Sequence, residues 1–169
     1  FAANLYDVVA RTGQRPLYED PARFFSLTYA TPALRDIAAA IAERLRGKSA
    51  KGIRQLEMTY GGGKTHTMLA VYHLARHLRD GGDPATLGGL APLVGTAGAT
   101  AWPKPQIAVF VGSSKGADVS LTLRDGPKLR TLWGYLAWRL AGEAGLKLVA
   151  EAEAARTNPG SELMVEVFR

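Results

Sequence analysis

The chain has 169 residues, of which 47% are hydrophobic and 21% charged, a composition typical of one globular domain and unlike that of a disordered chain. It has no cysteine, which excludes a disulfide framework, a thiolate metal site and a cysteine nucleophile. Lys and Arg exceed Asp and Glu in each third, divided at residues 50 and 100, by 7 to 5, 5 to 3 and 9 to 7. A surplus this even does not indicate a nucleic-acid surface, and the lack of a long apolar run predicts a soluble, cytoplasmic protein without a membrane partner.

The first 30 residues are interrupted by prolines, and we predict an irregular N-terminal arm over residues 1–30. The adjacent aromatic residues Phe24 and Phe25 require burial, which indicates that this arm docks on a core. A helix is then expected to begin at Thr31, which can cap the first amides and is followed by proline. Apolar residues continue at helical spacing until Gly47, where we expect the helix to end.

The middle of the chain alternates between predicted strands and helices. Residues 53–59 are short, partly alternating and stopped by three glycines, which predicts a strand. Residues 64–79 are apolar around much of the helical circumference, as in a helix packed against a sheet. Glycine and proline make residues 81–105 a long loop or insertion. The continuous apolar run at 107–111 predicts a strand buried on both faces of a parallel sheet.

Two further helices are predicted at residues 131–140 and 143–156, and a short final one beginning at Ser161. The order of elements predicts an α/β fold, with a parallel sheet flanked by helices. In this interpretation residues 31–169 form an incomplete nucleotide-binding domain of the phosphate-loop (P-loop) type. Because the chain opens at Phe1 without a signal segment, we expect it to be a piece of a longer protein.

The run Thr-Tyr-Gly-Gly-Gly-Lys-Thr-His at residues 59–66 lies between a predicted strand and a predicted helix. Glycines let several backbone amides face one oxyanion, and the free amides of a helix N-terminus add donors. Lys64 would neutralise the β and γ phosphates of ATP, and the hydroxyl of Thr65 would bind Mg²⁺. The pattern G-x-x-x-x-G-K-[ST] is matched in part, because Met58 occupies its first glycine position. The predicted cofactor-binding residues are Tyr60, Gly61, Gly62, Gly63, Lys64, Thr65 and His66.

The run from Leu56 to Ala75 resembles large AAA-type ATPases that carry a domain of unknown function and are often encoded beside DNA methylases in prokaryotic anti-phage loci. The resemblance also takes in Phe24-Phe25 with Thr28 and Thr31, Ile107 to Gly112, and Lys128 to Gly134. It implies an N-terminal, ATP-binding portion of a longer ATPase that uses Mg²⁺. Lys64, as the catalytic charge neutraliser, and Thr65, as the metal ligand, match that family's loop. Other subunits of a defence or DNA-modification complex are the implied partners, and nucleic acid is not indicated for this piece.

The family's acidic second motif, an apolar strand ending in Asp or Glu, is not found in this sequence. The run at 107–111 ends in Gly112, and Leu148 to Glu151 falls within a helical pattern. We expect the acidic strand to lie beyond Arg169. Two other functions stay open at this point: a nucleotide-dependent interaction module that does not hydrolyse ATP, and a small-molecule kinase.

Several other groups are weighed against ordinary structural roles. His66, His73 and His77 lack clustered carboxylates, so we interpret them as core or surface histidines and not as metal ligands. His66 either touches the nucleotide or orders the loop. Ser113 and Ser114 follow a predicted strand and are compatible with a second anion site, although a solvated loop is the simpler interpretation. We assign the basic cluster to the solvated surface: Arg124, Lys128 and Arg130. We assign the aromatic group to the core: Trp133, Tyr135 and Trp138.

Overall fold

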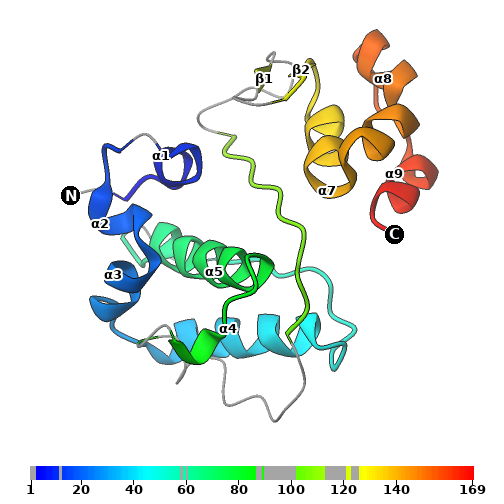
Figure 1. Ribbon diagram of the computed structural model, residues 1–169. Helices are drawn as coiled ribbons and strands as arrows, with labels where there is room; N and C mark the ends of the chain where they lie inside the picture. Colours follow the sequence, from blue (N-terminus) through cyan, green and yellow to red (C-terminus); the bar gives the residue numbers. More distant parts are fainter. Residues whose placement is uncertain are drawn as a thin grey trace. The chain divides into compact units, whose positions relative to one another are not determined.

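The structure is a computed structural model that describes residues 3–11, 13–57, 59, 61–86, 89, 102–112, 121–122 and 126–169. The chain divides into two compact units, Phe1–Pro105 and Gln106–Arg169. Helices dominate the described part of both units (Figure 1). Tyr60, Ser113, Ser114, Arg124 and most of the predicted loop at 81–105 lie outside the described residues.

The N-terminal arm is helical, which corrects the prediction of an irregular segment. It contains α1 (Leu5–Ala10), α2 (Pro16–Glu19) and α3 (Pro21–Ser26). Asn4 Oδ1 accepts a hydrogen bond from the Tyr6 amide at 2.9 Å, and Asp20 Oδ1 accepts one from the Arg23 amide at 2.8 Å. The prolines occupy first helical positions, where a missing N–H costs nothing, so they begin helices instead of interrupting the arm.

Helix α4 (Pro32–Leu45) confirms the prediction that a helix begins after Thr31 and ends at Gly47. The Thr31 hydroxyl accepts from the Leu34 amide at 3.2 Å. At the other end Gly47 has a φ of 72°, a left-handed conformation that glycine adopts without strain. The Lys48 amide then donates to the Glu43 carbonyl at 2.9 Å, so the carbonyls of the last turn keep hydrogen-bond partners.

Helix α5 (Lys64–Arg79) also forms where the sequence predicts it. Its buried face contains Leu69, Ala70, Leu74 and Leu78, each at most 3% exposed. This face packs in a helical environment, because α5 contacts α1, α4 and the short 3-10 helix η1 (Pro84–Thr86). The prediction that α5 packs against a sheet is therefore wrong.

The predicted α/β fold with a parallel sheet is wrong. Residues 51–57 have no regular secondary structure, and Ile53 is 91% exposed. Residues 107–111 are partly buried and likewise form no strand. In the described residues the strands are β1 (Leu121–Thr122) and β2 (Lys128–Leu129), paired antiparallel with Leu121 opposite Leu129. A short apolar run indicates only that its side chains favour burial. It forms a strand only where a neighbouring strand provides hydrogen-bond partners for its backbone N–H and C=O groups.

The C-terminal unit is built from α7 (Leu132–Leu148), α8 (Ala150–Ala155) and α9 (Ser161–Val167). The two helices predicted at 131–156 are placed differently, because α7 continues across a kink at Gly142, whose φ is 61°. Contacts join α7 to both α8 and α9. The buried residues at their centre are Ala137, Val149, Met164 and Val167, with Trp133 and Leu136 among the side chains packed against them.

Among the described helices, none has the length and apolar character that crossing a bilayer requires.

Candidate functional site

The glycine run forms the turn that leads into α5. Gly61 and Gly63 have φ angles of 79° and 85°, in the left-handed region that most L-residues avoid. The Gly62 amide donates to the Thr59 carbonyl at 3.1 Å and closes the turn. A Cβ atom built on Gly61 or Gly63 would meet no atom of the described residues within 4 Å, so these glycines are required by conformation and not by lack of room.

The first turn of α5 follows the glycine turn directly. Gly63 is the N-cap residue and provides no side-chain hydrogen bond, and the first turn contains no acidic residue. An α-helix leaves its first amides without intrahelical partners, and its N-terminus carries a partial positive charge. The residues present therefore fit a phosphate group: the donors are backbone N–H groups, the glycines place no Cβ atom in the way of an anion, and the first turn has no carboxylate that would repel one.

Lys64 and Thr65 follow the turn and are both half-buried. The Lys64 ammonium donates to the Thr59 carbonyl at 2.9 Å, so the side chain folds back over the glycine turn. The hydroxyl of Thr65 is a single oxygen donor, which suits Mg²⁺ when phosphate oxygens and water complete the shell. In the described ranges no group of three or more His, Asp or Glu side chains is arranged to hold a metal ion.

His66 joins the start of α5 to α3. Its Nε2 lies 3.1 Å from the Thr28 hydroxyl, and its ring stacks on Phe24 with centroids 4.6 Å apart. The Thr28 hydroxyl donates its proton to the Phe24 carbonyl at 2.7 Å, so it accepts from His66, and Nε2 carries the proton. Of the two roles left open for His66, this geometry supports ordering of the loop.

No sequence pattern points to this contact, because Thr28 and His66 are 38 residues apart. The only available signal is the pair Phe24-Phe25, whose rings require a cover that the arm itself does not provide. Both rings are buried, at 2% and 1% exposed, as predicted.

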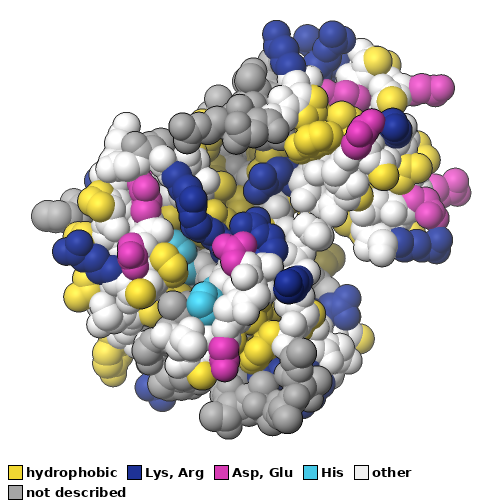
Figure 2. Space-filling view, viewed as in Figure 1, with side chains coloured by type: hydrophobic (Ala, Val, Ile, Leu, Met, Phe, Trp, Pro, Cys, Tyr) yellow, Lys and Arg dark blue, Asp and Glu magenta, His cyan; other side chains and the backbone are white. Residues whose placement is uncertain are grey.

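The other two histidines have separate partners. His73 is 1% exposed, and its Nε2 donates to the Tyr18 carbonyl at 2.7 Å. His77 Nε2 lies 2.9 Å from the Asp83 carbonyl and 3.2 Å from the Thr86 hydroxyl, next to η1. Because the three rings bond to different segments, they do not converge on one point. Figure 2 shows histidine surface at two separate places on one face of the N-terminal unit.

Stability should fall as the pH drops below the usual histidine pKa of about 6.5. Burial lowers the pKa of His66, and burial lowers that of His73 against the opposing effects of the Tyr18 hydrogen bond and Asp20. In His73 the buried Nδ1 has no hydrogen-bond partner, so a proton there would remain unsatisfied. The unfolded chain therefore binds more protons in this range, and stability is complete above it and declines below it.

Urea unfolding at a series of pH values measures this effect. We expect a slope of up to about 1.4 kcal/mol per pH unit for each of the two histidines below pH 6.5. In His73→Gln the slope should be smaller, whatever the variant's absolute stability. A slope unchanged by this substitution would contradict the assignment to His73.

Two aromatic candidates of the C-terminal unit have structural roles. Tyr135 is 8% exposed and its hydroxyl donates to the Val109 carbonyl at 2.6 Å, and Trp133 packs on the buried cluster, so the predicted core role is confirmed for both. Lys128 lies in β2 and is exposed. The Arg130 amide donates to the Glu153 carboxylate, a contact between distant residues that no local pattern indicates.

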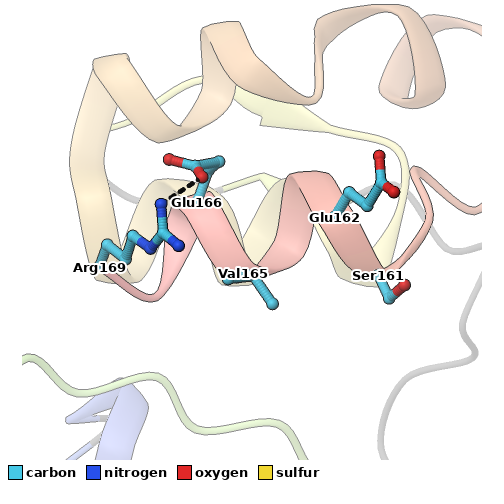
Figure 3. Close-up of a pocket in the computed structure, with 5 residues that line it drawn as sticks. All are labelled: Ser161, Glu162, Val165, Glu166 and Arg169. Atoms are coloured by element: carbon cyan, nitrogen blue, oxygen red, sulfur yellow. Dashed lines mark hydrogen bonds and ion pairs between the residues drawn. The ribbon is translucent and has the colours of Figure 1, made fainter.

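A hollow on α9 offers little to an anion. It is lined by Ser161, Glu162, Val165, Glu166 and Arg169 (Figure 3). Its one cation, Arg169, is paired with Glu166 at 2.7 Å, and Glu162 adds a further negative charge. The electrostatics of this hollow therefore oppose phosphate binding, in contrast to the glycine turn at α5.

Comparison with known proteins places the chain in a family. No curated protein and no solved structure matches it. The family model for the DUF499 N-terminal domain matches residues 1–169, the whole of the chain. The chain therefore belongs to the family of the DUF499 N-terminal domain.

Proposed function

We propose that this chain binds Mg-ATP through residues 61–66. The observation that carries the proposal is the glycine turn, with Gly61 and Gly63 at positive φ, opening directly onto the first turn of α5. Amides, an ammonium group and a hydroxyl then follow within a few residues of one another. Amides and an ammonium group are the hydrogen-bond donors that phosphate requires, and a hydroxyl oxygen can bind Mg²⁺. Glycines without side chains let the backbone approach the phosphates closely.

Each residue has a distinct role in the proposed complex. Backbone amides of the turn and of the first helical residues donate to phosphate oxygens. Lys64 exchanges its hydrogen bond with the Thr59 carbonyl for the β and γ phosphates, which neutralises their charge. Thr65 supplies a hydroxyl to Mg²⁺, and His66 holds the first turn of α5 against α3. In the intact protein we propose hydrolysis of the bound ATP by water, for which Mg²⁺ supplies charge neutralisation when bound.

Lys64→Ala should abolish the stabilisation that Mg-ATP confers on the chain. A ligand at about 100 times its Kd, bound only to the folded state, stabilises by about 2.7 kcal/mol. Thermal unfolding with and without Mg-ATP measures this shift. Lys147→Ala, which removes an exposed cation paired with Glu143, is the matched control and should respond to Mg-ATP like the unsubstituted chain.

Thr65→Ala adds a test of the metal role. We expect this variant to bind ATP without Mg²⁺ as the unsubstituted chain does, and to lose the additional stabilisation that Mg²⁺ provides. The proposal is wrong if the unsubstituted chain shows no shift with Mg-ATP, or if Lys64→Ala and Lys147→Ala shift equally.

A further inference from the structure

Five cations lie within residues 44–54, and no Asp or Glu interrupts them. We call these residues the basic segment. Its cations are Arg44, Arg46, Lys48, Lys51 and Arg54. A division of the chain at residue 50 cuts the cluster in two, which is why the charge surplus looks evenly spread when the chain is counted by thirds. Counted locally, this is a concentrated positive charge.

The structure exposes most of this charge. Lys48, Lys51 and Arg54 are exposed, and no ion pair joins any of the five cations to a carboxylate in the part of the chain that the structure describes. Arg44 Nη1 donates to the Ser49 carbonyl at 3.0 Å and shapes the turn after α4. The Arg46 guanidinium lies 3.8 Å from the centre of the Trp102 ring.

The end of α4 accounts for only part of the cluster. Cations in the last turn of a helix are favoured by its dipole, which explains Arg44 and Arg46. That effect falls off within one turn, so it does not reach Lys51 or Arg54. No carboxylate of the described residues lies within ion-pair distance of these groups, and their mutual repulsion favours an anionic partner.

We propose that the basic segment binds the phosphate backbone of nucleic acid. A small anion would neutralise one or two of the charges and leave the others repelling, whereas a polyanion can contact the exposed cations together. Lys48, Lys51 and Arg54 follow one another at intervals of three residues, a span of at most about 10 Å each, and nucleic acid offers phosphates more densely than that. Release of its counterions supplies the driving force.

Two features favour nucleic acid over an anionic membrane. Residues 46–57, which follow α4, form no helix, and Ile53 is the one large exposed hydrophobic residue of the segment. The Arg46 and Trp102 pair adds an aromatic side chain and a planar guanidinium beside the cations, a combination found where bases stack on protein. The small residues between the cations let a polymer approach closely: Gly47, Ser49, Ala50 and Gly52.

Fluorescence anisotropy with a labelled single-stranded oligonucleotide, and with the matching duplex, tests the proposal over a range of salt concentrations. The test variant is Lys48→Gln/Lys51→Gln/Arg54→Gln. Its control removes three exposed cations elsewhere in the same unit, so that both variants have a formal charge of +3 in place of +6. The control substitutions are Arg11→Gln, Arg23→Gln and Arg35→Gln.

We expect the test variant to bind the preferred oligonucleotide about tenfold more weakly or worse at low salt, with a salt slope smaller by about one for each phosphate that is no longer neutralised. The control should bind nearly as the unsubstituted chain does. Lys64→Ala should also bind normally, which keeps this result separate from the proposed ATP site. Thermal unfolding verifies that both triple variants fold, and the double variant Lys51→Gln/Arg54→Gln repeats the test farther from α4.

Three results would overturn the proposal. The first is the absence of binding to either oligonucleotide at low salt. The second is an equal decrease in affinity in the test and control variants, which would show that net charge alone is responsible. The third is equally tight binding of the chain to anionic lipid vesicles or to polyglutamate, which would make the segment a general polyanion or membrane contact.

Discussion

Phe24→Ala is expected to destabilise the N-terminal unit by about 3–5 kcal/mol, the usual cost of removing a buried phenylalanine side chain. Phe24 is 2% exposed, and its ring lies 5.2 Å from that of Phe25, 4.6 Å from that of His66 and 5.1 Å from that of His73. The substitution therefore leaves a cavity between α3 and α5 and removes the surface on which His66 stacks. Urea unfolding of this variant and of the unsubstituted chain measures the change in stability.

The same substitution should also affect the proposed ATP site. With its stacking partner gone, His66 holds the first turn of α5 less firmly, and the stabilisation by Mg-ATP should decrease even in those molecules that remain folded. Tyr29→Ala is the matched control, because Tyr29 is an aromatic residue of the same region but is 83% exposed. It should change stability by less than about 0.5 kcal/mol. Equal destabilisation by the two variants would contradict the burial of Phe24 against α5.

Gly134→Ala is expected to destabilise the C-terminal unit by about 1–3 kcal/mol, from overpacking and from the disruption of two hydrogen bonds to Glu153. A Cβ atom at Gly134 would collide with the carboxylate of Glu153. That carboxylate accepts from the Arg130 amide and, at 2.5 Å, from the Thr131 hydroxyl, which is itself buried. To make room the carboxylate must shift, which weakens both hydrogen bonds and takes the acceptor away from the buried Thr131 hydroxyl proton, while the Thr131 oxygen still accepts from the Gly134 amide.

A second glycine of the same unit provides the control for Gly134→Ala. Among the described residues, a Cβ atom at Gly112 would meet a carbon of Phe110 at an ordinary van der Waals distance of 3.7 Å. Gly112→Ala should therefore change the free energy of unfolding by less than about 0.5 kcal/mol. If chemical denaturation gave the same midpoint for both alanine variants, the contact between α7 and α8 through Glu153 would be excluded.

These two predictions describe contacts of the same kind. In each unit a side chain from one helix satisfies or covers a group that lies far away in the sequence: His66 bonds Thr28 across 38 residues, and Glu153 bonds Thr131 across 22. Such contacts place the glycine turn beside α3 in one unit and hold α8 against the start of α7 in the other. These long-range hydrogen bonds provide partners for polar side chains, such as those of Thr131 and His66, that belong to no recognisable contact motif in the sequence.

The sequence by itself determined the features that depend on neighbours within one turn of the chain. Thr31 and Gly47 mark the ends of α4 because a hydroxyl can cap the amide three residues on and a glycine can adopt a positive φ. The start of α5 at Lys64 follows from the glycines before it for the same reason. The residues of the candidate phosphate loop were therefore identifiable without a structure.

Only the tertiary structure decided what surrounds these local features. The runs at 53–59 and 107–111 have the composition of strands, but a strand requires a partner elsewhere in the chain, and no local pattern states whether one is present. The prediction of an irregular arm over residues 1–30 is wrong because it considers only local signals. The short helices of the arm are stabilised by packing Phe24 and Phe25 on α5 more than by their own helix propensity. Sequence periodicity does not encode long-range packing. This is why the sequence predicted a parallel sheet where the described residues are mostly helical.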